Sequence, residues 1–158
     1  MKSIKNFSLI FIALTFILLS GISISTAQEK VQPSLYERLG GIHAIATVVD
    51  DFVERVWVND VLNQNPKNKQ AMGLEKPALK YLATELLGQA TGGPQKYTGR
   101  SLKEVHKNLN ISEKEWDAFM ADLKASLNKF KVPDKEQQEV ISIVNSTKPD
   151  IVTVSNIK

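Results

Sequence analysis

Two histidines, His43 and His106, are the residues of this 158-residue sequence best suited to metal or proton-transfer chemistry. They do not form the H-x-x-x-H pattern of a zinc-binding helix, and neither has a carboxylate at the spacing of a metal triad. The sequence contains no cysteine, which excludes thiolate metal sites, iron–sulfur clusters and the covalent attachment of c-type haem. These absences argue against a zinc or di-iron centre.

His106 and His43 differ in their surroundings. His106 shares a helical face with Leu102 and Leu109, at i−4 and i+3, so its ring is expected to point where the apolar side chains point. His43 follows a glycine pair in the first turn of a predicted helix, and we expect it to be exposed. Spacing alone leaves His106 with two interpretations, a core residue or a metal ligand.

The elements that must position these residues are helices, and the sequence predicts an all-α domain. Three Ser-x-x-Glu pairs predict capping boxes at helix starts: Ser34–Glu37, Ser101–Glu104 and Ser112–Glu115. Apolar residues at three- and four-residue steps predict longer helices that begin near residues 42, 77, 113 and 134. Residues 59–76 predict a long irregular connection with at most one helical turn, and the tail past Asp150 is expected to be frayed or partly strand-like.

The first 27 residues have the pattern of a secretory signal peptide. Lys2 and Lys5 precede an apolar run, residues 7–22, and small residues lead up to Ala27. We expect cleavage after Ala27, so that the domain of residues 28–158 is exported, either periplasmic or secreted, and free of the membrane. Because the apolar run approaches the length of a membrane span, an uncleaved anchor is the alternative. No Lys/Arg cluster interleaves with aromatic residues, so no nucleic-acid partner is expected.

Several motifs carry a resemblance to a known family. They are residues 34–41 (SLYERLGG), 49–52 (VDDF), 92–94 (GGP) and 97–106 (YTGRSLKEVH). In this order and at these distances they resemble the group I truncated haemoglobins, over most of the domain. The resemblance implies a two-over-two helical sandwich around haem b, with positive φ at the glycine pairs. It also implies that His106 is the proximal ligand, binding iron through Nε2 while Nδ1–H donates to a backbone carbonyl.

The resemblance also implies which side chains surround the haem. Tyr97 and Arg100 are expected to contact the haem propionates, because Arg suits carboxylates; the alternative is a loop tyrosine and a solvated arginine. The expected apolar contacts are Phe52, Val53, Leu79, Leu82, Ala83, Leu86, Leu102, Val105, Leu109, Ile111, Trp116, Val140 and Val144.

The distal side departs from the family. Val53 stands where the family usually has a tyrosine, and Ala83 stands where Gln is common, with Leu79 one turn earlier. Asn65 and Pro66 replace the usual pair of phenylalanines that wedge the haem. Without a distal hydrogen-bond donor, we expect weak retention of oxygen, little discrimination between oxygen and CO, and rapid autoxidation.

Other residues near this region offer alternatives. Tyr81, Gln70 or Met72 would replace the missing polar contact if one of them reached the distal side. Lys80 is a further possible iron ligand, but its helical register is expected to point it aside.

The expected function is reversible binding of O2, NO or CO at haem iron. One alternative is an exported haem redox enzyme, an NO dioxygenase or a peroxidase-like protein, which would need a reductant. The other is a haem-free, globin-like interaction module, which the missing phenylalanines keep open.

Overall fold

The computed structural model describes residues 32–71 and 76–154, without the side chains of residues 69–71. The chain divides into two units, Met1–Val31 and Gln32–Lys158, and every described residue belongs to the second. The predicted signal peptide, residues 1–27, lies outside the described residues, so its cleavage stays a prediction. Within the described ranges, no helix is long and apolar enough to cross a membrane.

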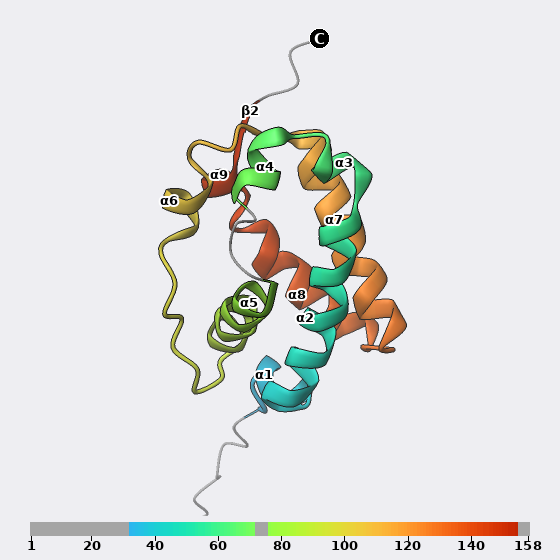
Figure 1. Ribbon diagram of the computed structural model, residues 1–158. Helices are drawn as coiled ribbons and strands as arrows, with labels where there is room; N and C mark the ends of the chain where they lie inside the picture. The colour runs from blue at the N-terminus through green and yellow to red at the C-terminus, as the bar shows by residue number, and fades with distance from the viewer. Residues whose placement is uncertain (1–31, 72–75, 155–158) are drawn as a thin grey trace, which may run out of the picture. The chain divides into compact units, whose positions relative to one another are not determined.

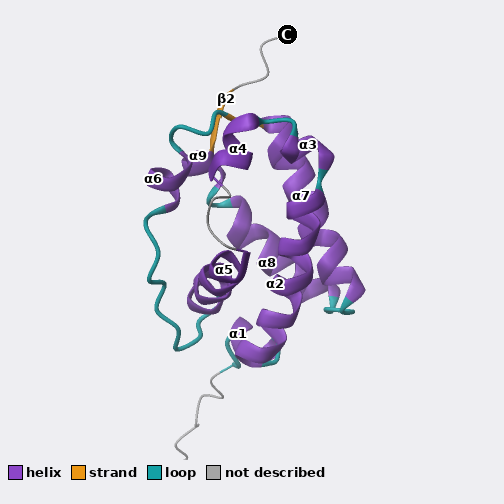
Figure 2. Ribbon diagram, in the orientation of Figure 1, coloured by secondary structure: helices purple, strands orange, loops and turns teal. Residues whose placement is uncertain are grey.

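Five helices form the framework of the second unit (Figure 1). They are α1 (Leu35–Arg38), α2 (Gly41–Val58), α5 (Lys76–Ala90), α7 (Glu113–Lys129) and α8 (Asp134–Asn145). Helix α2 is central, because it packs against both α5 and α7, while α8 contacts α7 and α1. The predicted all-α class is confirmed, and helices dominate the chain in Figure 2.

Two apolar clusters hold these helices together. The larger one joins α1, α2, α7 and α8 through Leu35, Val48, Leu123, Leu127 and Val140. The second lies on the face of α2 turned to α5 and consists of Ile45, Val49 and Val53, with Leu79, Ala83 and Leu87 packed against it. The three- and four-residue steps of these positions along α2 are the amphipathic pattern that the sequence predicts.

The connection between α2 and α5 contains two short helices, α3 (Asp60–Asn63) and α4 (Pro66–Ala71). The expectation of a largely irregular connection is therefore wrong. Asn59 begins α3, because its Oδ1 accepts hydrogen bonds from the N–H groups of Val61 (2.9 Å) and Leu62 (3.4 Å). Helices this short leave little apolar periodicity, so capping residues were the available signal.

The three predicted capping boxes form to different extents. Those at Ser34 and Ser112 form in both directions and start α1 and α7. At α6 (Leu102–His106) only one half forms: Ser101 Oγ accepts from the Glu104 N–H at 3.2 Å. The Glu104 carboxylate instead lies 3.7 Å from the guanidinium of Arg100, so the third box is a simple N-cap.

The glycine pairs make the turns that separate these helices. Gly40, Gly41 and Gly92 have positive φ, as expected, but Gly93 does not. At the end of α5 the N–H of Gly93 donates to the carbonyl of Gly88 (2.8 Å) and that of Gly92 to Gln89 (3.1 Å), the pattern of a Schellman motif. Position 93 requires glycine for a steric reason, because a Cβ there would lie 2.4 Å from Cδ2 of Tyr36.

The tail returns to the segment that follows α6. It forms α9 (Lys148–Ile151) and β2 (Val152–Val154), and β2 pairs in parallel with β1 (Ile111–Ser112). The partners are Ile111 with Val152 and Ser112 with Val154, with an irregularity between them. The strand-like part of the expectation is confirmed, whereas α9 was not predicted.

Candidate functional site

His106 is the last residue of α6, and its side chain is partly buried. Its Nδ1 lies 2.7 Å from the carbonyl oxygen of Leu102, one turn earlier, so Nδ1–H is the donor in this bond. Burial lowers the pKa of His106, and the bond to the Leu102 carbonyl opposes that change only in part. The ring is therefore neutral near pH 7 and carries its lone pair on Nε2, the form in which an imidazole binds a metal.

His43 does not share these properties. It lies in the first turn of α2 and is exposed, as the sequence predicts. Among the described residues, no three His, Cys, Asp or Glu side chains come together in a way that would hold a metal ion. His106 is thus the histidine whose surroundings prepare it as a ligand.

The loop between α5 and α6 is tied to the outer face of α5. Oε2 of Glu85 accepts hydrogen bonds from the Oγ1–H (2.6 Å) and N–H (3.1 Å) of Thr98. One turn along α5, Gln89 Oε1 accepts the N–H of Tyr97 at 2.7 Å. These bonds fix the path of the chain that leads to His106.

Tyr97 and Arg100, the predicted propionate partners, make local contacts in this loop. The Tyr97 hydroxyl donates to the carbonyl of Arg100 at 2.9 Å. The Arg100 side chain is 69% exposed and pairs with Glu104. Their contacts with haem remain predictions.

Tyr36 anchors the beginning of the same loop. Its hydroxyl accepts hydrogen bonds from the N–H of Ile42 (3.0 Å) and from Nε2 of Gln95 (3.3 Å), and its ring packs beside Gly41 and Gly93. The sequence places Tyr36 within the motif of residues 34–41, but no role was predicted for its side chain. The contact with Gln95 joins residues far apart in the chain, and periodicity carries no signal for such a pair.

The predicted distal residues come together, and they are all apolar. Val53 is 2% exposed in the cluster on α2, and both Leu79 and Ala83 of α5 pack against that cluster. Phe52, next to Val53, instead meets Phe119 of α7 edge to face, with ring centroids 4.9 Å apart. Trp116 also stacks on Phe119, with ring centroids 5.6 Å apart. Ile111 is buried in β1.

Most of the predicted contacts on α5, α6, α8 and the turn after α6 are partly exposed apolar side chains. In α5 the one buried residue is Gly88, although Leu79, Ala83 and Leu87 pack against the core clusters. Such side chains have surface left to contact a flat apolar group. The partly exposed set is Leu79, Leu82, Ala83, Leu86, Leu102, Val105, Leu109 and Val144.

Comparisons with known proteins agree with this arrangement. The family model described as bacterial-like globin matches residues 34–153. The group 1 truncated hemoglobin of Tetrahymena thermophila is 31% identical over 121 residues, which cover 77% of this chain and 96% of that protein. The chain belongs to the bacterial-like globins, and within them to the group I truncated haemoglobins.

Solved truncated haemoglobins share the fold of this globin. The Fe(III) form of the Tetrahymena pyriformis protein superposes with a TM-score of 0.69 at 24% identity, covering 77% of this chain and all of that one. The 2/2 hemoglobin of Synechococcus sp. PCC 7002, solved in the cyanomet state with covalently attached heme, gives 0.67 at 25% identity, covering 76% and 98%. The two-over-two globin fold expected from the sequence is confirmed.

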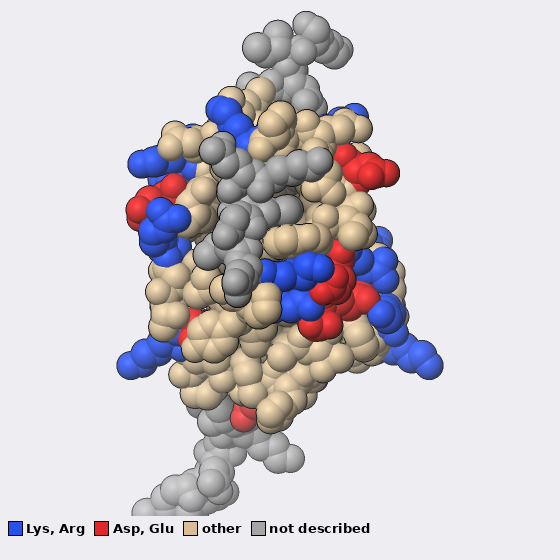
Figure 3. Space-filling model, viewed as in Figure 1, with Lys and Arg blue, Asp and Glu red and all other residues tan. Residues whose placement is uncertain are grey.

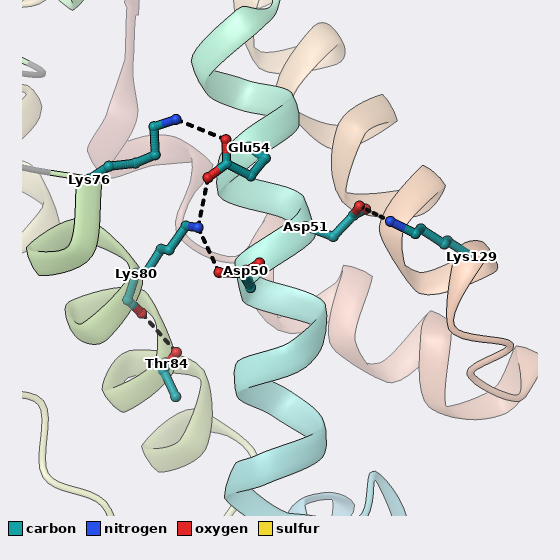
Figure 4. A network of polar contacts seen from close by, with 7 residues as sticks. All are labelled: Asp50, Asp51, Glu54, Lys76, Lys80, Thr84 and Lys129. Carbon is teal, nitrogen blue, oxygen red and sulfur yellow. Dashed lines mark hydrogen bonds and ion pairs between the residues drawn. The ribbon is translucent and has the colours of Figure 1, made fainter.

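Lys80 of this globin is engaged away from the predicted site. Its Nζ lies 2.6 Å from Oδ1 of Asp50 and 2.7 Å from Oε1 of Glu54, and these bonds tie α5 to α2 (Figure 4). Lys76 contacts the same Glu54 carboxylate at 2.8 Å. Basic and acidic side chains accordingly adjoin where α2 and α5 meet on the surface in Figure 3. The expectation that Lys80 points aside is consistent with these contacts.

Of the alternative residues for the distal side, the structure describes the side chain of Tyr81 but not those of Gln70 and Met72. Tyr81 is 61% exposed, and a hydrogen bond to Glu85 raises the pKa of its hydroxyl, so it lies on the outer face of α5. It therefore does not supply the missing polar contact. Met72 and the side chain of Gln70 lie outside the described residues.

Asn65, which stands in the place of a wedging phenylalanine, has a different task in this globin. Its Nδ2 donates to the carbonyl of Leu109 (3.0 Å) and to Oε1 of Glu115 (2.8 Å). Asn68 donates to the same Glu115 oxygen at 2.9 Å. Glu115 is buried, and its other oxygen closes the capping box of α7. A polar clamp therefore joins the α3–α4 segment to the turn after His106.

A hollow of about 370 Å³ lies where α1, α2, α5, α7 and α8 meet. Its lining comes from α1, α2, α5, α7, α8 and the turn after α7, and includes Arg38, Phe130 and Val140. Arg38 is held by Glu136 at 2.9 Å and by Glu139 at 2.5 Å. Val140 is 0% exposed, so it differs from the partly exposed predicted contacts: it lies in the core and lines this hollow.

Proposed function

We propose that this globin holds haem b through Nε2 of His106 and reversibly binds a small gas, O2, NO or CO. The observation that carries the proposal is the state of the His106 ring, which is neutral, partly buried and oriented by the Leu102 carbonyl. When bound, haem iron supplies a coordination position at which a diatomic molecule binds reversibly. The sequence contains no cysteine, so the haem cannot be attached through thioether bonds, which favours haem b over c-type haem.

The residues of the chain divide the remaining tasks. The Leu102 carbonyl fixes the tautomer and orientation of His106, while the partly exposed leucines of α5 and α6 would cover the porphyrin. Val53, Leu79 and Ala83 would line the gas-binding side with hydrocarbon, exclude water and offer no hydrogen-bond donor. A gas with little charge, such as CO, then loses less from the missing donor than oxygen does.

The test is a titration of the purified protein with hemin, followed by ferric, ferrous and ferrous–CO spectra. We expect a Soret shift at one equivalent and a five-coordinate ferrous spectrum that changes on addition of CO. His106→Ala should abolish the shift, and His43→Ala, which alters the exposed histidine, should leave it intact. A protein that leaves the hemin spectrum unchanged would instead be the haem-free interaction module.

We also propose that the protein is exported with cleavage after Ala27, on the pattern of Lys2, Lys5 and the apolar run of residues 7–22. N-terminal sequencing of the protein recovered outside the cytoplasm should begin at Gln28. Recovery of the intact N-terminus in the membrane fraction would support the anchor instead.

A further inference from the structure

The helix that carries His106 has few contacts with the core. Helix α6 contains no buried residue, and among the described elements α9 is the one with which it makes the most contacts. In Figures 1 and 2, α6 and α9 lie side by side at one end of the molecule, away from the crossing of α2 and α7. The position of His106 therefore depends on α9 more than on the framework helices.

Helix α9 is itself fixed at two points. Lys148 Nζ lies 2.5 Å from Oε2 of Glu113, in the first turn of α7. Directly after α9, Val152 pairs with Ile111 and Val154 with Ser112, in the strand that links α6 to α7. Residues 148–154 thus contact α6, β1 and α7, the elements that precede and follow the turn after His106.

We propose that residues 148–154 form a strap that positions His106 as an iron ligand, an inference that rests on the proposed function. Leu102 and His106 lie in the same helix, so the histidine ring and the carbonyl that orients it shift together when α6 shifts. Losing the strap leaves the bond between Nδ1 and Leu102 in place but frees α6 to shift relative to the framework. The strap therefore controls where Nε2 points, and not which nitrogen carries the proton.

The direct test compares three chains: the full-length protein, one that ends at Thr147 and a matched control that ends at Val154. In the haem-free proteins, we expect amide exchange in α6 to be about tenfold faster in the chain that ends at Thr147. Without α9 packed against it, α6 opens locally more often and exposes its amide groups to water. The control chain should match the full-length protein. Equal exchange in all three chains would overturn the strap.

The haem-bound proteins give the second readout. Loss of the strap should accelerate haem release about tenfold, as loss of support for a metal ligand commonly does. It should also broaden the iron–histidine stretching band of the ferrous protein, a signature that a general loss of stability would not change. An unchanged band with faster haem release would assign the tail a merely structural role.

A milder variant covers the case in which the chain ending at Thr147 does not fold. Lys148→Gln removes the ion pair with Glu113, and we expect exchange in α6 to rise about threefold, as suits a partly exposed pair. Lys124→Gln changes an exposed lysine of α7 and should have no effect. No change in Lys148→Gln would contradict the strap.

The two proposals fail in different ways. Hemin binding that is insensitive to His106→Ala would overturn the proposed function. Exchange in α6 is measured without haem, so it decides whether the strap holds this helix in either case.

Discussion

Oε2 of Glu85 accepts two hydrogen bonds from one residue, Thr98, at 2.6 Å from its hydroxyl and 3.1 Å from its N–H. This pairing joins α5 to the middle of the loop that leads to His106. Together with a bond from Tyr81, it holds the pKa of the Glu85 carboxyl below its ordinary value of 4.5. The attachment of the loop is therefore sensitive to acid.

The first prediction concerns the pH dependence of this attachment. Because the pKa of Glu85 is lower in the folded than in the unfolded chain, its stabilising effect is complete above about pH 4.5 and is lost as the pH falls through the folded value. Urea unfolding should show Glu85→Gln to be less stable than the wild type at pH 7, with a difference that shrinks towards pH 3. Asp117→Asn, at an exposed position of α7, should show no such trend. A difference that is constant with pH would contradict the assignment.

The second prediction adds the missing distal donor. Ala83 is partly exposed and packs against the Val53 cluster, so Ala83→Gln would place an amide donor on the expected gas-binding side. A charge-assisted hydrogen bond of about 1.4 kcal/mol would slow oxygen release about tenfold and change CO release much less. Flash photolysis and stopped-flow mixing measure both rates. Ala83→Met, similar in length without a donor, should resemble the wild type, and equal effects of Gln and Met would refute the hydrogen bond.

The third prediction concerns Lys80 as a possible iron ligand. Its ammonium is bound to Asp50 and Glu54, and these carboxylates raise the pKa of Lys80, which keeps it charged and unable to bind iron. Lys80→Met should therefore leave the ferrous spectrum unchanged while lowering the melting temperature slightly. Conversion from a six-coordinate to a five-coordinate spectrum in this variant would show that Lys80 had occupied the iron.

The sequence was informative where structure follows from local pattern. The capping residues Ser34 and Ser112 and the apolar steps along α2 and α7 located the main helices, because caps and periodicity act over a few residues. The spacing of His106 predicted that it lies on an apolar face. Only the family resemblance favoured the interpretation of His106 as a metal ligand over that of a core residue.

What the sequence did not yield depends on contacts between distant segments. The contacts of Asn65 with Glu115 and of Val152 with Ile111 join parts of the chain that no local pattern relates. Val140 is a second example of this limit. Its spacing marks it as inward-facing, but which part of the interior it faces depends on how α8 packs against α1, α2 and α7.

The fourth prediction concerns the clamp built on Glu115. Its carboxylate accepts from Asn65 and Asn68 through one oxygen and from Ser112 through the other, in a buried setting. Glu115→Ala removes one acceptor from each asparagine amide, which keeps its bond to a backbone carbonyl, and removes the acceptor of Ser112. It should lower the free energy of unfolding by about 2–3 kcal/mol. Glu115→Gln keeps one acceptor oxygen, so its free energy of unfolding should lie between those of Glu115→Ala and the wild type. Urea unfolding measures both.

A double-mutant cycle separates the clamp from the helix cap. Asn65→Ala removes the bond to Glu115 and the bond to the Leu109 carbonyl, but it leaves the capping box of α7 intact. Because Asn65 and Glu115 share a bond, the loss in the double variant should be smaller than the sum of the single losses by about 1 kcal/mol. Additive losses would mean that Glu115 acts through the cap alone, and that the α3–α4 segment is held to the turn after His106 by other contacts.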